Sequence, residues 1–135
     1  MAAMSDYLEN KLIDFVFRGQ AYSAPTTIYV GLLTTGTSDA NTGQVEVTGG
    51  SYARVAVTSS LANWAGTQAA ASTVASTGTS GTTSNNGVIT SFGMYDAATG
   101  GNLLFYGNLS TSKTVNNGDA APTFAAAALS IQLDN

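Results

Sequence analysis

The sequence predicts a mainly β fold, an antiparallel β-sandwich of jelly-roll-like type with one N-terminal α-helix. Helical hydrophobic spacing occurs once, over residues 5–18, whereas the remainder alternates short β-prone runs with polar turns. The densest apolar block, residues 87–109, has the composition of a β-hairpin. The chain shows no linker and no internal repeat, so we expect one structural domain, 1–135, with its sandwich over residues 26–133.

The helix is predicted over residues 5–18. Ser5 or Asp6 is suited to the N-cap, and Gly19 stands where a C-terminal cap belongs. The apolar residues at helical spacing form a wide stripe: Leu8, Leu12, Ile13, Phe15, Val16 and Phe17. We expect this stripe to face the core, and the alternative is that part of it is shared with a neighbouring subunit.

The next predicted strand, residues 26–35, is apolar on both faces. Val30 and Leu32 point to one side, whereas Tyr29 and Leu33 point to the other. A strand of this kind belongs in the middle of a sheet or at an interface between subunits.

A polar loop follows at residues 36–50, and a further strand is predicted within residues 51–60. Arg54 of this strand and Glu46 of the loop are the only opposite charges close in sequence here. We expect them to form a salt bridge that holds the loop to the strand, with a contact to a partner as the alternative role of Arg54. The acids and amides of the loop lack the ligand spacing of a calcium-binding EF-hand.

Trp64 is the sole tryptophan, and its large apolar ring is expected to cover the core beside a long loop. That loop is predicted over residues 65–86, which consist almost wholly of Ala, Ser, Thr, Gly and Asn. A short strand at residues 71–75 is the one element expected inside it. Because long loops in compact domains are usually functional or mobile, we expect this one to lie over a neighbour or to extend into solvent.

The predicted hairpin has two β-prone arms, residues 88–95 and 103–109, around a turn at residues 96–102. In the turn, an aspartate, a threonine and two glycines supply the side-chain-to-backbone hydrogen bonds and positive φ angles of a tight reversal. Near the end of the chain, apolar and polar residues alternate over 129–133, which predicts a half-buried closing strand.

The composition argues against catalysis. The chain has no histidine and no cysteine, which excludes Ser–His–Asp and Cys–His catalysis, thiolate metal sites and disulfides. No Gly-rich phosphate loop with a lysine is present. The composition does not exclude a pair of carboxylates for glycoside hydrolysis. The available acids, however, lie in turn-like contexts where their side chains form hydrogen bonds with their own backbone. We therefore expect no enzyme and no cofactor.

The charge pattern limits the partners. Charged residues make up 9% of the chain, the net charge is −4, and the four basic residues are scattered. Nucleic-acid binding needs clustered Lys and Arg, and a membrane span needs roughly 18 apolar residues, so we expect neither partner. No secretion signal is visible, which predicts folding in the cytoplasm of the producer. A polar surface with few charges tolerates close packing of identical subunits.

In the order of these features, the chain resembles a family of small bacteriophage virion proteins of the tail-fibre-like and head-decoration types. The segments that resemble this family occur in the same order over residues 5–133: 7–14, 18–22, 25–32, 50–54, 92–104 and 129–133. The order of the segments is more specific than any one of them.

The resemblance implies a non-enzymatic structural subunit, made in the host cytoplasm and placed on the outer surface of the capsid or on the tail. The first expectation is a capsid decoration (cement) protein, a homotrimer bound to the major capsid protein, because the chain is short and lacks fibre repeats. The alternative is a tail-tip, collar or tail-fibre component that contacts tail proteins and the host. A carbohydrate-binding β-sandwich module is the second alternative.

For an assembly role, the apolar helix face, the hairpin and the termini are expected to make the subunit contacts. The residues assigned to the subunit interface are Leu12, Phe15, Tyr29, Leu33, Arg54 and Trp64. No residue is assigned to a catalytic, cofactor or metal site.

Overall fold

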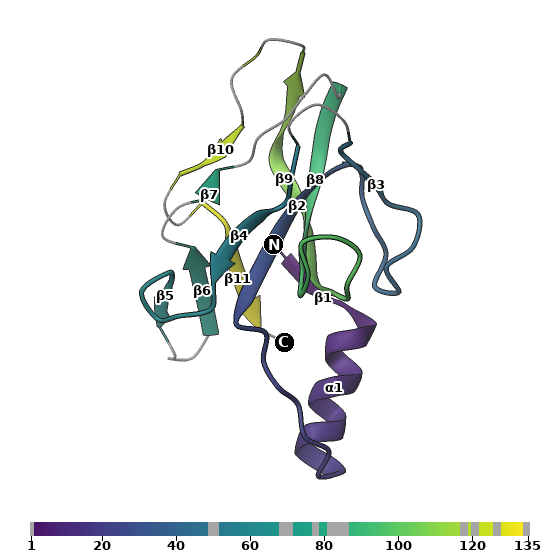
Figure 1. Ribbon diagram of the computed structural model, residues 1–135, viewed down its shortest axis with the longest axis vertical. Coiled ribbons are helices and arrows are strands. Elements are labelled where there is room, and N and C mark those ends of the chain that lie inside the picture. Colours follow the sequence, from purple (N-terminus) through teal and green to yellow (C-terminus); the bar gives the residue numbers. More distant parts are fainter. Residues whose placement is uncertain are drawn as a thin grey trace.

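The computed structural model describes residues 2–48, 52–67, 72–76, 79–80, 87–116, 119, 122–125 and 128–133. Strands dominate these residues, and one α-helix, α1 (Asp6–Phe17), follows the first strand (Figure 1). The strands are β1 (Ala2–Met4), β2 (Thr27–Thr35), β3 (Val45–Glu46), β4 (Val55–Thr58), β5 (Trp64–Thr67), β6 (Ser72–Ser76), β7 (Thr79–Ser80), β8 (Gly87–Tyr95), β9 (Leu103–Val115), β10 (Thr123–Phe124) and β11 (Ser130–Leu133). The predicted class, mainly β with an N-terminal helix, is confirmed.

The described strands form one large and two small sheets, and every pairing is antiparallel. The large sheet has the order β1-β9-β8-β2-β3, and β4 also pairs with β2; the small sheets are β11-β6-β5 and β10-β7. Val30 and Met94 of the large sheet share one buried cluster with Leu129 and Ile131, at β11. Two sheets therefore contribute to a common core, which is consistent with the predicted sandwich.

β8 and β9 form the predicted hairpin, in which Gly93 lies opposite Tyr106. In the turn, the Asp96 carboxylate accepts hydrogen bonds from the backbone N–H and the side-chain amide of Asn102, each at 2.7 Å. Gly101 has a φ of +73°, and a Cβ at this position would lie 2.6 Å from the Asp96 carboxylate. The aspartate and glycine roles expected from the sequence are thus confirmed.

β2 lies inside the large sheet, between β8 on one side and β3 and β4 on the other (Figure 1). One face of this strand contributes Val30 and Leu32 to the buried clusters. On the opposite face Leu33 is fully buried and Tyr29 is half-buried. The sequence allowed two positions for this strand, the middle of a sheet or a subunit interface, and the structure shows it in the middle of a sheet.

Residues 65–86 contain more strand than the long loop with one short strand that the sequence predicts. β5 begins at Trp64, β6 lies within one residue of the short strand expected at 71–75, and β7 follows. β6 pairs with both β5 and β11, and Val74 lies opposite Ile131. These strands form through backbone hydrogen bonds to their partner strands. In a segment of Ala, Ser and Thr the side chains give little indication of such pairing. Residues 68–71, 77–78 and 81–86 of the predicted loop lie outside the described part of the chain.

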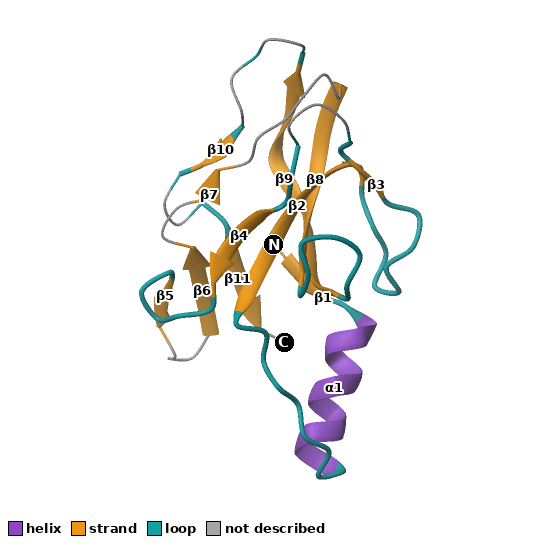
Figure 2. Ribbon diagram, viewed as in Figure 1, coloured by secondary structure: helices purple, strands orange, loops and turns teal. Residues whose placement is uncertain are grey.

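α1 begins at a predicted cap, Ser5, which is fully buried. The Ser5 hydroxyl accepts a hydrogen bond from the Leu8 N–H at 3.3 Å and donates one to the Leu103 carbonyl. Gly19 follows the helix with a φ of +64°, as expected of a C-terminal cap. Leu8 is the one buried residue of the helix, so the expectation that the apolar stripe faces the core is wrong for most of it. Figure 2 shows the reason: the helix extends past the end of the sheet, beside the segment 18–26 that returns to β2.

Candidate subunit interface

The structure does not bring the six predicted interface residues together. They lie on α1 (Leu12 and Phe15), on β2 (Tyr29 and Leu33), just before β4 (Arg54) and at the start of β5 (Trp64). Leu33 has no exposed surface, and the Arg54 side chain is only 7% exposed, so both make their contacts within the chain. Trp64 is half-buried against the core, which is the position expected for it. Of the elements that carry predicted interface residues, α1 is the one with large apolar side chains exposed to a possible partner.

The exposed part of α1 forms an apolar surface that we call the helix patch. Its four members are large apolar side chains more than half exposed: Ile13 (52%), Phe15 (55%), Val16 (64%) and Phe17 (80%). Of these, the sequence analysis assigned only Phe15 to an interface. The width of the apolar stripe could have predicted that Ile13, Val16 and Phe17 are exposed. Six apolar residues in a helix of 12 cover more of its circumference than one sheet face can bury.

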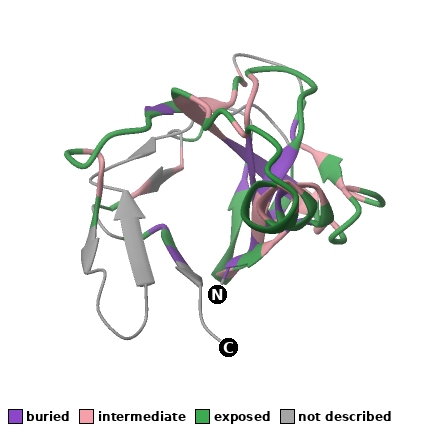
Figure 3. Ribbon diagram, turned by 90° about the horizontal axis from the view of Figure 1, so that it is seen from below, coloured by how far each residue is buried: buried purple, intermediate pink, exposed green. Residues whose placement is uncertain are grey.

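The helix is attached to the body at its first turn. The Ser5 N–H donates to the Leu104 carbonyl and the Asp6 N–H donates to the Asp39 carbonyl, each at 3.0 Å. These bonds tie the start of the helix to β9 and to the loop before β3. In the view from below, the helix surface is mostly exposed (Figure 3). The helix patch is therefore presented at one end of the molecule by a helix that is fixed at its other end.

A polar cluster centred on Arg54 lies on the face of β2 and β8 opposite the core. The Arg54 Nε and Nη2 atoms donate to the two carboxylate oxygens of Glu46, both at 2.8 Å. The Tyr52 hydroxyl donates to the same carboxylate at 2.8 Å, and the guanidinium lies 3.5 Å from the ring centroid of Tyr95. The predicted salt bridge between Arg54 and Glu46 is confirmed.

Arg54 also holds the turn of the β8–β9 hairpin. Its Nη1 atom donates to the carbonyl oxygens of Ala97 and Gly100, at 2.9 and 2.8 Å. One side chain therefore joins the hairpin turn, the strand β3 and the start of β4. This arrangement positions a loop, and it uses most of the N–H donors of the guanidinium for contacts within the chain.

The cluster makes the fold sensitive to acid. Burial by itself raises the pKa of Glu46, but hydrogen bonds from Arg54 and Tyr52 and the Arg54 charge outweigh it, so this pKa lies below its usual value of 4.5. A carboxylate whose pKa is lowered by folding stabilises the fold above its unfolded-state pKa, and this contribution is lost as the pH falls through the folded-state pKa. We therefore expect the urea midpoint to fall below about pH 4.5 and Glu46→Gln to flatten that fall. The same acid dependence in the variant would contradict this assignment.

Over residues 3–132, from β1 to β11, the chain matches the family model described as podophage GP4 fiber I protein gp80. The chain belongs to this family. The predicted resemblance to phage virion proteins of the tail-fibre-like type is confirmed, and the gp80-family protein is a structural component of the virion. No curated protein matches the chain.

A membrane-spanning helix and a metal cluster are two further features that can be looked for in the described residues of this gp80-family protein. None of the helices there is long and apolar enough to cross a membrane. Acidic side chains do not gather in groups of three that could hold a metal ion in the part of the chain described. The helix patch is the candidate surface for subunit contacts, because its large apolar side chains are exposed.

Proposed function

We propose that this gp80-family protein is a non-enzymatic structural subunit of the phage tail-fibre apparatus and that it joins copies of itself through the helix patch. The family assignment supports a place in the fibre. The projecting helix, with four large apolar side chains in solvent, is the observation that supports self-association. Neighbouring tail proteins are the further partners that we propose.

The helix patch has the properties of a surface that is covered in the assembled particle. A helix of 12 residues is marginal in water unless its apolar face packs against another element. Burying a side chain such as Val16 or Phe17 contributes roughly 1.5–3 kcal/mol. With four such side chains on each copy, packing of identical helices is favourable and also stabilises the helix itself.

We propose a closed homo-oligomer, a trimer, in which the three helices pack around the symmetry axis. Each copy presents its helix at one end of the molecule, so copies related by rotation can bring their helices into one bundle. The helix and its cap carry charges of both signs, with Glu9 and Asp14 beside Lys11 and Arg18. Neighbouring helices can therefore offer each other opposite charges around the apolar contact.

The tail fibre, rather than the capsid, is the placement we propose. Capsid decoration, the first expectation from the short chain, has no support in the family description. The copy number in purified virions separates the two: a few to a few tens of copies fit the tail, and hundreds fit a capsid shell. A carbohydrate-binding module is less favoured, because the Tyr52 hydroxyl is bonded to Glu46 and Trp64 packs against the core.

Phe17→Asp is expected to convert the oligomer into folded monomers, because it places a charge in the most exposed part of the helix patch. Light scattering coupled to size exclusion gives the mass, and circular dichroism reports the retained strands. The matched control is Gln20→Asp, which adds the same charge at an exposed polar position just after the helix and should leave the mass unchanged. A monomeric wild-type protein at micromolar concentration, or a Phe17→Asp oligomer of unchanged mass, would overturn the proposal.

A further inference from the structure

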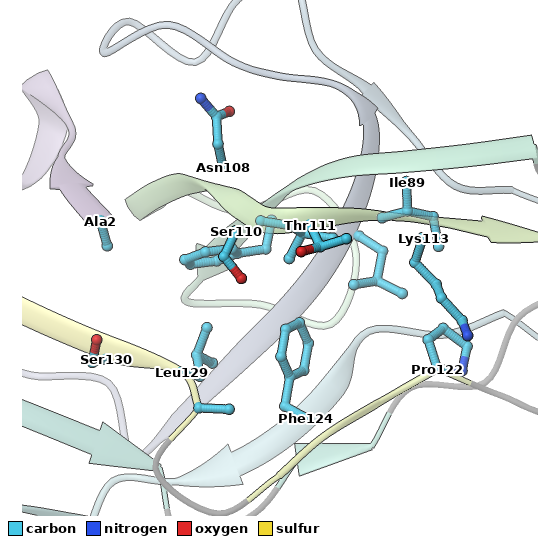
Figure 4. Close-up of a pocket in the computed structure, with 14 residues that line it drawn as sticks. Ala2, Ile89, Asn108, Ser110, Thr111, Lys113, Pro122, Phe124, Leu129 and Ser130 are labelled. Carbon is cyan, nitrogen blue, oxygen red and sulfur yellow. The ribbon is translucent and has the colours of Figure 1, made fainter.

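A cleft of about 620 Å³ opens between β9 and the segments that bear β10 and β11. Figure 4 shows Ser110 and Thr111 on the β9 side and Phe124 and Leu129 on the opposite side. None of the residues that line the cleft belongs to α1 or to the Arg54 cluster. Neither the family description nor the proposed assembly gives it a role.

The cleft lies along the part of β9 that follows its pairing with β1. β1 pairs with β9 only as far as Gly107, which lies opposite Ala2. From Asn108 onward, none of the described strands pairs with this edge of β9, whereas β8 continues on the other side. The residues of β9 that line the cleft fall between 108 and 113 and belong to this part of the strand.

A bulge in β9 shapes the rim of the cleft. Asn108 pairs with Ser91 and Lys113 pairs with Ile89, so residues 109–112 of β9 face a single residue of β8. Such a bulge bends its strand and re-aims the side chains within it. In Figure 4 the hydroxyl group of Ser110 points into the cleft.

The walls of the cleft are apolar, and a cation lies at one end. The apolar lining comes from both sides of the sandwich: Leu32, Ile89, Phe92, Leu109, Phe124 and Leu129. The rings of Phe92 and Phe124, which both line the cleft, meet edge to face with centroids 6.5 Å apart. The Lys113 ammonium lies beside Pro122 (Figure 4). The lining residues that the structure describes include no acid, and Lys113 forms no ion pair with a described carboxylate.

We propose that this cleft binds a small amphipathic anion, with its aliphatic or aromatic body between β9 and Phe124 and its anionic group at Lys113. The volume lies within the roughly 300–1,000 Å³ of small-molecule sites, which are also mainly apolar with a few placed polar groups. An ammonium group and a carboxylate or phosphate form a charge-assisted hydrogen bond, which is the contact that Lys113 offers at its end of the cleft. The inference goes beyond the fibre role and does not depend on the helix patch.

An extended peptide could also occupy the cleft by pairing with the open edge of β9. Two features of β9 make such pairing unfavourable. A bulge and a lysine on an edge strand are features that discourage pairing with another strand. Both are present here, at residues 109–112 and at Lys113. The structure therefore favours a small ligand that uses the apolar walls over a peptide that uses the backbone.

Octanoate is the probe for this proposal, and octan-1-ol is its uncharged counterpart. Titration of the full chain, followed by chemical-shift changes and calorimetry, is expected to give saturable binding of one octanoate per chain with a dissociation constant of about 1 mM or below. Lys113→Ala is expected to weaken octanoate about tenfold and to leave octan-1-ol unchanged. Equal effects on the two probes would overturn the assignment of the anionic group to Lys113.

A variant that fills the cleft provides the second test. Ser110→Phe places a ring into the cleft from an exposed position and should abolish binding of both probes. Ser112→Phe is the matched control, because Ser112 is an exposed serine on the same strand and does not line the cleft. Both variants should keep the wild-type circular dichroism spectrum. Absence of saturable octanoate binding, or undiminished binding to Ser110→Phe, would overturn the proposal.

The natural anion has two possible sources, a free acid or the headgroup and acyl chain of a membrane lipid. Dihexanoyl phosphatidylglycerol, used below its micelle concentration, distinguishes them. Displacement of octanoate by this lipid supports a lipid source, and binding of octanoate without displacement supports a free acid. Either result keeps the site at Lys113, which the two variants test independently.

Discussion

Arg54→Ala is expected to lower the free energy of unfolding by about 3–5 kcal/mol, because it leaves a half-buried carboxylate without its partner. The Glu46 side chain is 25% exposed and receives both ends of the guanidinium fork. After truncation, its remaining side-chain donor is the Tyr52 hydroxyl. A carboxylate in this position has lost much of its hydration, and water cannot restore it without opening the cluster.

Two further losses add to the effect. The carbonyl oxygens of Ala97 and Gly100 lose the donor that holds the hairpin turn. The ring of Tyr95 loses the cation stacked on it at 3.5 Å. We expect amide hydrogen exchange to increase across residues 96–102, in addition to the lower stability measured by urea unfolding.

The other ion pair of the described chain is the control. Arg18 pairs with Asp14 at the same distance, 2.8 Å, but the Arg18 side chain is 70% exposed. Arg18→Ala is therefore expected to cost at most about 0.5 kcal/mol. If both alanine variants lost the same stability, burial would not be the reason for the Arg54 effect. The double variant Arg54→Met, Glu46→Leu should recover much of the loss, because it removes both charges together.

The local elements that residue types alone specify could be predicted from the sequence. Ser5 and Gly19 mark the ends of the helix because a cap hydroxyl and a positive φ are local requirements. Asp96 and Gly101 fix the hairpin turn in the same way. The ion pair of Arg54 was also predictable, since only one acid lies near it in sequence.

The elements that depend on distant pairing could not be predicted. β6 consists of small residues, and the evidence for it is its pairing with β11, more than fifty residues later in the sequence. The cleft is formed by β9 together with Pro122, Phe124 and Leu129, and no local pattern in these segments indicates that they lie opposite each other.

The position of the helix relative to the sheet could not be predicted from the sequence either. Periodicity shows that an apolar stripe exists, but it does not show whether a sheet or another subunit covers it. The width of the stripe was the one indication in the sequence of an exposed apolar surface. It favoured Ile13, Val16 and Phe17 as interface residues over Leu33 or Arg54. Those two residues were assigned to an interface for being apolar or charged, whereas the chain buries both.

Gly93→Ala is expected to lower the free energy of unfolding by about 3 kcal/mol, the upper end of the range for over-packing. A Cβ at this position would lie 2.8 Å from both Cε2 and the hydroxyl oxygen of Tyr95. The ring cannot easily move away, because Tyr95 is 2% exposed and Arg54 is stacked on it. Thermal and urea unfolding measure the cost.

A double-mutant cycle identifies the cause of that cost. Tyr95→Leu removes the ring and is itself destabilising, since a buried aromatic contact with Arg54 is lost. In the Tyr95→Leu background the new methyl group has no ring to meet, so Gly93→Ala should cost less than about 1 kcal/mol. If the cost stayed at its full value without the ring, the glycine would be required by the backbone of β8 rather than by the packing of Tyr95. A Cβ at Gly31 would lie 3.3 Å from the same ring and 2.9 Å from the Glu46 carboxylate. A steric cause would therefore mean that both glycines make room for one cluster.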